Sequence, residues 1–207
     1  MGTNVFVEID TPEASLLADY TGIQYDLSSA QEFARMLLAE RTKERPNWSL
    51  APPLTIAVMV QYARSFATGV RMPIANEILA RLTPEQLTKH KRFLEIRNKH
   101  VAHSVNTFEE SRPVARYWVE RVKEEGISDI QSTHHRIIGL SEQDLEDVIE
   151  LTAVLLANIG SRIDAERARL LQIVRTMPLD KVLVGRRDFV LSSPDPAKPR
   201  RSLRQKA

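Results

Sequence analysis

The stretch SEQDLEDVIELTAVLLANIGSRIDAERARLLQIVRTMP, from Ser141 to Pro178, decides the fold. Ser141 is of the residue type that caps helix N-termini, and a helix cannot continue normally into Pro178. Between them, apolar side chains and one threonine recur at the spacing of a single helix face. The stripe consists of Leu145, Val148, Ile149, Thr152, Leu155, Leu156, Ile159, Ile163, Leu170 and Val174. We predict a helix of roughly 35 residues, or about 53 Å, which is longer than a small bundle needs. Either Gly160 breaks it, or its second half leaves the body to meet a partner.

Two helices are predicted in the first third of the chain. Ser29 and the residues after it have the form of a capping box followed by an apolar stripe, and this helix ends before Pro46. Residues 54–67 are apolar nearly all round and follow two prolines that suit a helix start. Gly69 stands where a C-terminal cap is expected. The second helix is therefore predicted to be the most buried.

A third helix begins at Thr83, which combines with Gln86 in a capping box around a first-turn proline. We predict that this helix extends to about His103 and that residues 74–82 form a short connecting helix before it. Together with the long helix from Ser141, these segments predict an up-down four-helix bundle.

The region between residues 111 and 140 is ambiguous. Residues 114–122 and 130–140 are rich in β-branched and aromatic side chains, and the segment between them contains turn residues, which favours a β-hairpin. A helix over residues 113–125, capped by Gly126, fits almost as well. We favour the hairpin, so the predicted fold class is all-α, or mainly α with a small β-hairpin insertion.

The 207 residues are 43% hydrophobic and carry a net charge of +2, as expected for one globular domain with appendages. We assign 1–26 to an N-terminal arm, 27–177 to the helical domain, and 178–207 to a basic tail that is expected to be disordered. The last 14 residues alone carry a net +4, so the rest of the chain is slightly acidic. The tail either solubilises the protein or contacts phosphate or an acidic partner.

Composition also excludes several kinds of chemistry. The absence of cysteine excludes disulfides, thiolate metal sites and a cysteine nucleophile. No apolar stretch is long enough to cross a membrane, and residues 1–10 lack the basic start of a signal peptide, so we expect a cytoplasmic protein without membrane association. His100 and His103 form an i, i+3 pair, but no third ligand with convincing spacing accompanies them. We therefore expect neither a metal nor another cofactor.

The chemically suggestive residues lie at the end of the third helix. Arg97, His100 and His103 follow at i, i+3 and i+6, so on a regular α-helix they form one continuous ribbon. Arg97 and His103 are then about 9 Å apart along the axis, which lets both side chains reach one ligand. Phe93 and Ile96 lie on the same side, so the ribbon is expected to face a core or an interface.

These residues resemble the hallmark of the HEPN superfamily, in which an arginine is followed by four to six residues and a histidine, often with Asn or Asp directly after the arginine. Arg97, Asn98 and His103 match each element. The resemblance extends over residues 26–177 as architecture, but only these three residues carry it as sequence. It implies a metal-independent ribonuclease, commonly a toxin or phage-defence effector, whose active site forms where two protomers bring their motifs together.

The residue types suit such chemistry. His103 would act as general base or acid, Arg97 would bind the phosphate, Asn98 would orient its neighbours, and His100 is an accessory candidate. Arg200, Arg201 and Arg204 of the tail are the candidate RNA-binding residues. The competing interpretation is that Arg97 caps the end of its helix together with an acidic neighbour from the helix that starts at Ser29 or from the long helix after Ser141. His100 and His103 would then be ordinary half-buried side chains.

Two kinds of function are compatible with these residues: an endoribonuclease, and a non-catalytic helical interaction or scaffolding protein of the same fold. A homodimer is expected for two reasons. A phosphate needs both an acid and a base, and the long apolar stripe needs a second copy to cover it. Phe93, Ile96, His100 and His103 would then lie in the dimer interface. Other expected partners are RNA and an antitoxin or another protein.

Overall fold

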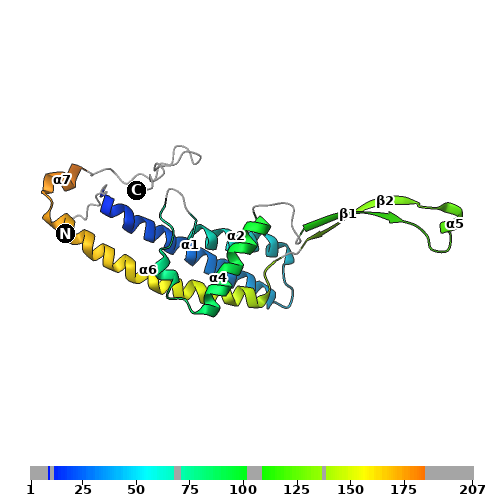
Figure 1. The fold of residues 1–207 in the computed structure, drawn as a ribbon, viewed down its shortest axis with the longest axis horizontal. Coiled ribbons are helices and arrows are strands. Elements are labelled where there is room, and N and C mark those ends of the chain that lie inside the picture. Colours follow the sequence, from blue (N-terminus) through cyan, green and yellow to red (C-terminus); the bar gives the residue numbers. More distant parts are fainter. Residues whose placement is uncertain (1–8, 10–11, 68–70, 102–108, 137–138, 185–207) are drawn as a thin grey trace.

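The computed structural model describes residues 9, 12–67, 71–101, 109–136 and 139–184. This part of the chain is mostly helical, and a two-stranded antiparallel sheet projects from one end of the helical body (Figure 1). The prediction of a mainly α fold with a small hairpin is therefore confirmed. In chain order the elements are α1 (Pro12–Arg41), η1 (Trp48–Leu50), α2 (Ala51–Arg64), α3 (Asn76–Leu79), α4 (Pro84–Ile96), η2 (Arg97–Val101), β1 (Glu109–Arg116), α5 (Val122–Glu125), β2 (Asp129–Arg136), α6 (Glu142–Thr176) and α7 (Leu179–Val184).

The two longest helices, α1 and α6, pack along each other in opposite directions (Figure 1). The Gln31 side chain donates a hydrogen bond to the carbonyl of Ile149 at 3.1 Å. Ten residues further along α1, the Arg41 guanidinium donates to the carbonyl of Leu140, just before α6 begins. Because the contacts on α6 move backwards as those on α1 move forwards, the pair is antiparallel.

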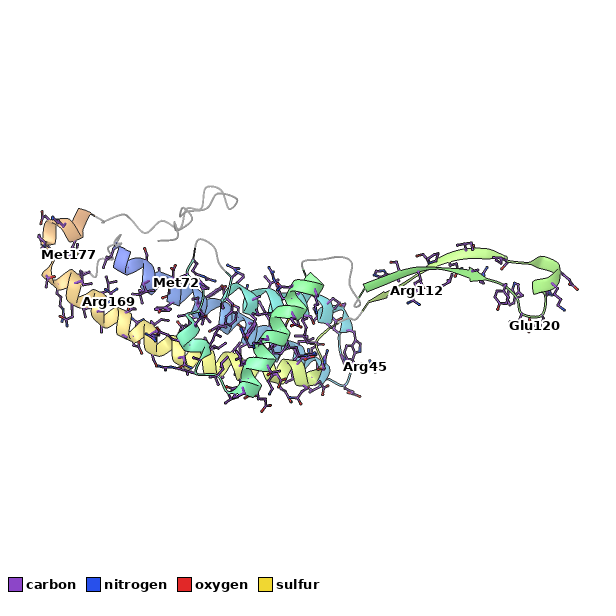
Figure 2. The ribbon with its side chains drawn as sticks, viewed as in Figure 1. Arg45, Met72, Arg112, Glu120, Arg169 and Met177 are labelled. Carbon is purple, nitrogen blue, oxygen red and sulfur yellow. The ribbon has the colours of Figure 1, made fainter. Side chains whose placement is uncertain are left out.

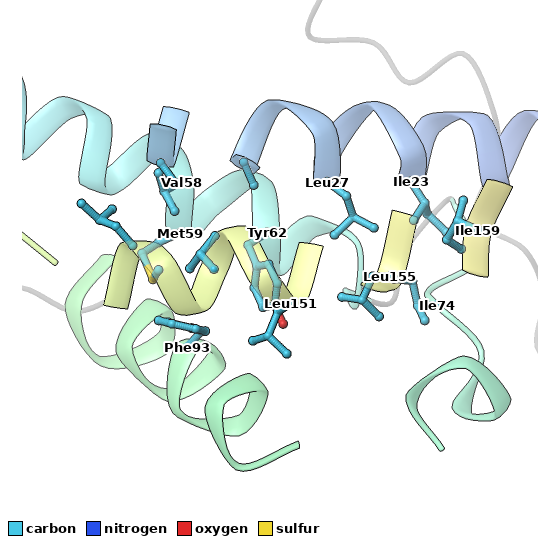
Figure 3. Packing of buried hydrophobic residues seen from close by; sticks show 14 of the residues in the cluster. Ile23, Leu27, Val58, Met59, Tyr62, Ile74, Phe93, Leu151, Leu155 and Ile159 are labelled. Atoms are coloured by element: carbon cyan, nitrogen blue, oxygen red, sulfur yellow. The ribbon is translucent and has the colours of Figure 1, made fainter. Parts of the chain in front are cut away.

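The long helix predicted from Ser141 is confirmed, but neither expectation about its second half holds. α6 continues through Gly160 without a break, and Ile159 and Ile163 are buried in the same core as Ile23 of α1 (Figure 3). The apolar stripe is covered from within the chain, because α1 is 30 residues long. The length of α6 therefore no longer argues for a dimer.

The predicted helix start at Ser29 is wrong, because α1 begins at Pro12 and Ser29 lies inside it. Residues 12–26, which were predicted to belong to an N-terminal arm, are the first half of this helix. Ile23 is fully buried, and the buried carboxylate of Asp26 forms an ion pair with Arg71. A capping-box pattern marks a helix start only where the preceding chain is not helical, and here burial of the upstream residues continues the helix.

Helices α2 and α4 complete the body. α2 packs on α1, and its Tyr62 ring lies 5.9 Å from Phe93 of α4 in an edge-on contact (Figure 3). The predicted capping box at the start of α4 is present: Thr83 accepts from the Gln86 backbone at 3.2 Å, and Gln86 accepts from the Thr83 backbone at 3.1 Å. The four residues from Thr83 to Gln86 were thus enough to predict that a helix begins here.

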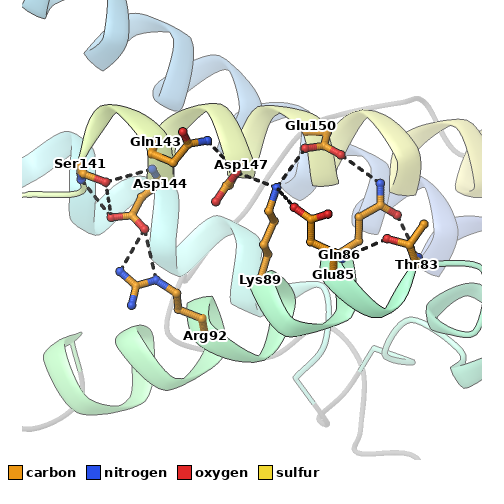
Figure 4. A network of polar contacts seen from close by, with 10 residues as sticks. All are labelled: Thr83, Glu85, Gln86, Lys89, Arg92, Ser141, Gln143, Asp144, Asp147 and Glu150. Atoms are coloured by element: carbon orange, nitrogen blue, oxygen red, sulfur yellow. Dashed lines mark hydrogen bonds and ion pairs between the residues drawn. The ribbon is translucent and has the colours of Figure 1, made fainter.

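α4 is also joined to α6 by charged side chains (Figure 4). The ammonium of Lys89 lies 2.9 Å from the carboxylate of Asp147 and 3.4 Å from that of Glu150. One turn later, Arg92 donates to Asp144 at 3.1 Å. The hydrogen bond to Asp147 raises the pKa of Lys89, so this lysine stays charged at any physiological pH. These contacts fix how α4 lies on α6.

The hairpin prediction is confirmed against its helical alternative. β1 pairs antiparallel with β2, in a register that joins Arg116 with Asp129 and Ser111 with His134. β1 begins earlier than predicted and ends before the aromatic residues Tyr117 and Trp118, which lie in the connection that contains α5. Turn residues and β-branched side chains identified the hairpin, but not where its first strand ends.

The α1–α6 core provides a direct test. Leu155→Ala should lower the free energy of unfolding by about 2–5 kcal/mol, because it leaves a cavity at a fully buried position of α6. Leu171→Ala, on an exposed position of the same helix, is the control and should change it by less than about 0.5 kcal/mol. Urea denaturation followed by circular dichroism measures both, and equal losses would contradict the arrangement.

Candidate functional site

The candidate site lies where α4 ends. A regular helix was predicted to reach about His103, but α4 ends at Ile96 and a π-helical turn, Arg97–Val101, follows. A π-helical turn has i to i+5 hydrogen bonds and therefore more residues per turn than an α-helix. The even ribbon of Arg97, His100 and His103 predicted for a regular helix therefore does not apply. Such turns are frequent at functional sites, where they redirect side chains.

Arg97 and Asn98 are held together by this turn. The guanidinium of Arg97 donates from NH1 to Oδ1 of Asn98 at 3.0 Å. Arg97 is half-buried, while Asn98 is exposed. The Nε of Arg97 is buried and has no hydrogen-bond partner among the described residues. The amide thus orients one edge of the guanidinium and leaves donors on it unused.

The competing interpretation expected Arg97 to pair with an acidic neighbour from one of the long helices. Within the described residues, no carboxylate lies within ion-pair distance of its guanidinium. Glu95, two residues before Arg97 in the chain, has another partner, because its carboxylate lies 3.8 Å from the ammonium of Lys99. A half-buried cation held by a neutral amide retains its attraction for an anionic ligand, as long as no carboxylate neutralises it, and none of the described carboxylates does.

The remaining predicted residues are not brought to this point by the described part of the structure. His103 lies in the segment 102–108, outside the described residues. The same holds for Arg200, Arg201 and Arg204 of the predicted tail, of which residues 179–184 form the short helix α7. For His100 only the backbone is described, as part of the π-helical turn. Of the predicted site residues, the structure therefore describes the side chains of Arg97 and Asn98 and their contact.

Phe93 was expected in a dimer interface, and this expectation is wrong. Its side chain is only 1% exposed and packs against Tyr62 inside the chain. Ile96 is half-buried and packs against the same core. Because Phe93 lies on the same side of the predicted helix as the histidines, the sequence predicted that it is buried. It could not tell whether the burying surface belongs to the same chain or to a second copy.

A buried histidine that the sequence did not single out lies on α4, the helix that leads to the site. His90, on α4, forms a 2.9 Å hydrogen bond between its Nδ1 and the Tyr62 hydroxyl, and its ring lies 4.5 Å from that of Phe66. The sequence signal for the burial of His90 is that it lies three residues before Phe93, which puts both side chains on the same side of a helix. Burial lowers the pKa of His90, with a smaller contribution from Lys91, and burial raises the pKa of Tyr62. The pair is therefore neutral at physiological pH and anchors α4 on α2.

Comparisons with known proteins add no relative: no family model matches the chain, and neither the curated proteins nor the solved structures contain a significant match. Two further properties concern the described residues only. None of their helices has both the length and the apolarity needed to cross a membrane. They also contain no group of three or more His, Asp or Glu side chains placed to hold a metal ion.

The buried histidine predicts how stability depends on pH. A histidine whose pKa is lowered by folding favours the neutral form in the folded state, so the free energy of unfolding falls as the pH drops below about 6.5. His90→Gln should flatten this part of the profile. His134→Gln, at an exposed histidine of the hairpin, should leave it unchanged. Denaturant melts between pH 5 and 8 measure the effect, and a profile that H90Q does not alter would contradict it.

Proposed function

We propose that this protein is an HEPN-like, metal-independent endoribonuclease in which α1, α2, α4 and α6 form the four-helix bundle of the domain. The observation that carries the proposal is the Arg97–Asn98 contact at the end of α4. It supplies an arginine that is oriented by the residue next to it and is not neutralised by any carboxylate among the described residues. This is the arrangement that a phosphate-binding arginine requires.

In the proposed reaction, the 2′-hydroxyl of one nucleotide attacks the adjacent phosphorus. His103 takes the hydroxyl proton, and the bond from phosphorus to the 5′-oxygen breaks. The leaving oxygen takes its proton from a general acid, for which the proposed homodimer supplies a second His103, and a cyclic 2′,3′-phosphate remains. Arg97 binds the non-bridging oxygens, on which negative charge grows, and Asn98 keeps the guanidinium in place. His100 is an accessory candidate, and Arg200, Arg201 and Arg204 would bind RNA.

The proposal includes a homodimer, because one motif supplies a single arginine and a single motif histidine for roles on two sides of the phosphate. It also assigns the protein to the cytoplasm, with a toxin or phage-defence role and an antitoxin or another protein as a partner.

A second candidate is a non-catalytic interaction or scaffolding protein of the same fold. It is favoured by the hairpin, which projects from the body and exposes aromatic side chains at its tip, with 59% of Trp118 accessible. Exposed aromatic groups of this kind are typical of protein–protein interfaces.

Incubation of the purified protein with mixed RNA in EDTA tests the proposal. Cleavage should persist in EDTA, because His103 and Arg97 replace a metal. Arg97→Ala should reduce it about 100- to 1,000-fold, since a donor to the developing phosphate charge is lost. His103→Ala should abolish it, and Asn98→Ala should cause a smaller loss. Lys99→Ala removes an exposed positive charge from the same turn and should retain activity, which makes it the matched control.

Thermal unfolding of each variant should stay close to that of the unmodified chain, because Asn98 and Lys99 are exposed and Arg97 forms no ion pair with a described carboxylate. Cleavage that disappears in EDTA, or that survives both R97A and H103A, would reject the ribonuclease. The absence of any cleavage, combined with a stable complex with another protein, would favour the scaffolding candidate.

A further inference from the structure

Two half-buried arginines of the helical body have no carboxylate partner among the described residues. The half-buried arginines in that part of the chain are Arg41, Arg71, Arg97 and Arg162. Arg71 forms an ion pair with Asp26, and Arg162 forms one with Glu77 at 2.8 Å. Arg41 and Arg97 instead bind a carbonyl and an amide. A guanidinium is always charged, and a half-buried charge without a counter-charge favours the binding of an anion.

Arg41 is the last residue of α1 and lies towards the end of the body from which the hairpin projects. Arg45, four residues later, stands at this end in Figure 2, far from Arg169 and Met177 at the other end. The Arg41 guanidinium donates to the carbonyl of Leu140, which lies between β2 and α6. Its Nε is buried and has no hydrogen-bond partner among the described residues. The carbonyl thus fixes the guanidinium and leaves a donor on it unused.

Thr55, on α2, carries a second unused group. A threonine hydroxyl within a helix can donate to a backbone carbonyl three or four residues earlier. The other threonines in the described helices all form this bond: Thr21, Thr88, Thr152 and Thr176. Thr55 is only 4% exposed, yet its hydroxyl has no hydrogen-bond partner among the described residues. A buried hydroxyl that does not bond its own helix calls for a partner from outside it.

Gly139 brings these two groups to one place. A Cβ added to Gly139 would lie 3.0 Å from the hydroxyl oxygen of Thr55 and 3.5 Å from Nη2 of Arg41. The side chain of Ala51, the first residue of α2, lies 4.0 Å from the same point. Because glycine has no side chain, the space between the guanidinium and the hydroxyl stays clear at this residue.

The surroundings of this point favour a negative charge. α2 begins here, and no side chain caps its N-terminus. Prolines in its first turn lack an N–H, so the helix contributes the positive end of its dipole rather than hydrogen bonds. The acid next to Arg41 in the chain, Glu40, is already bound by Lys43 and by the backbone N–H of Asn47. An anion beside Gly139 would therefore meet positive charge without competition from Glu40.

We propose that Arg41 and Thr55 bind a phosphate group beside Gly139. The Nε of Arg41 and the hydroxyl of Thr55 donate to its oxygens, and the guanidinium supplies the counter-charge. Phosphate suits these donors better than a carboxylate, because the donors come from two different helices and phosphate presents oxygens in several directions. The site is separate from Arg97 and does not depend on the proposed function.

Calorimetric titration of the full-length chain with inorganic phosphate, at constant ionic strength, tests the site. The unmodified protein should bind phosphate. Thr55→Val keeps the shape of the side chain but removes the hydroxyl, and it should weaken binding about tenfold. Arg41→Gln removes the counter-charge and should weaken binding at least as much. Arg35→Gln, at an exposed arginine of the same helix, is the matched control and should bind like the unmodified protein.

A substitution at Gly139 gives a second readout that leaves both donors in place. The methyl group of Gly139→Ala would stand between Thr55 and Arg41, so phosphate binding should be lost. Gly160→Ala adds the same group to α6, where it meets nothing within 4 Å, and should leave binding unchanged. Phosphate should raise the unfolding temperature of the unmodified protein and of G160A, but not that of G139A, which separates loss of the site from loss of the fold.

Three results would overturn the proposal. The first is an unmodified protein that binds no phosphate, in which case Arg41 and Thr55 form only a structural contact. The second is binding that survives both T55V and G139A. The third is binding that R97A abolishes and R41Q leaves intact, because the phosphate would then belong to the site at the end of α4.

A DNA oligonucleotide, which has no 2′-hydroxyl and cannot be cleaved by the proposed reaction, distinguishes two sources of the phosphate group. DNA binding that R41Q weakens assigns the site to a nucleic-acid backbone. DNA binding that R41Q does not alter, combined with loss of inorganic phosphate binding in R41Q, assigns it to a free phosphate compound. RNA cleavage without phosphate binding at Arg41 would overturn this site alone and leave the ribonuclease intact.

Discussion

The antiparallel contact between α1 and α6 is the interaction on which the rest of the structure depends. Apolar side chains follow along α1 at alternating steps of three and four residues, through Tyr20, Ile23, Leu27 and Ala30, and α6 presents a matching stripe. Two helices of 30 and 35 residues bury these stripes against each other, and α2 and α4 add residues such as Tyr62 and Phe93 to the same core. α2 packs on α1, and α3 and α4 contact α6.

The position of α4 is the most specific consequence of that arrangement. Its apolar contacts with α2 are few but aromatic, and the Tyr62–His90 hydrogen bond makes them directional. On its other side, Lys89 and Arg92 face carboxylates of α6 (Figure 4). Because α4 is fixed from two sides, the turn that follows it, with Arg97, has a defined place at the end of the body. A candidate phosphate-binding arginine gains from such fixation, since orientation is what a bound anion requires.

The hairpin between α4 and α6 is stabilised in a different way from the helical body. The body has a continuous buried core, whereas the hairpin has paired strands and no core. A two-stranded sheet alone is only marginally stable in water, and exposed apolar side chains such as Trp118 and Val119 lie in the connection between its strands.

The sequence by itself determined the features that depend on neighbours along the chain. The capping box at Thr83, the cap at Ser141, the stripe of α6 and the existence of the hairpin were all predictable, because caps, turns and periodic stripes are local chemistry. Arg97 and Asn98 are likewise adjacent, so their contact needed only a local turn. Whether His103 joins them stays a prediction.

Only the tertiary structure decided the features that depend on what lies opposite a residue. Ser29 has the pattern of a helix start but lies within α1, because burial of upstream residues such as Ile23 outweighs a local capping signal. Phe93 lies in the chain's own core rather than between copies, and both Phe93 and His90 pack against Tyr62 of α2, since a stripe on one helix does not say which surface covers it. Periodicity encodes which side of an element is buried, whereas the partner surface is chosen by packing among distant segments.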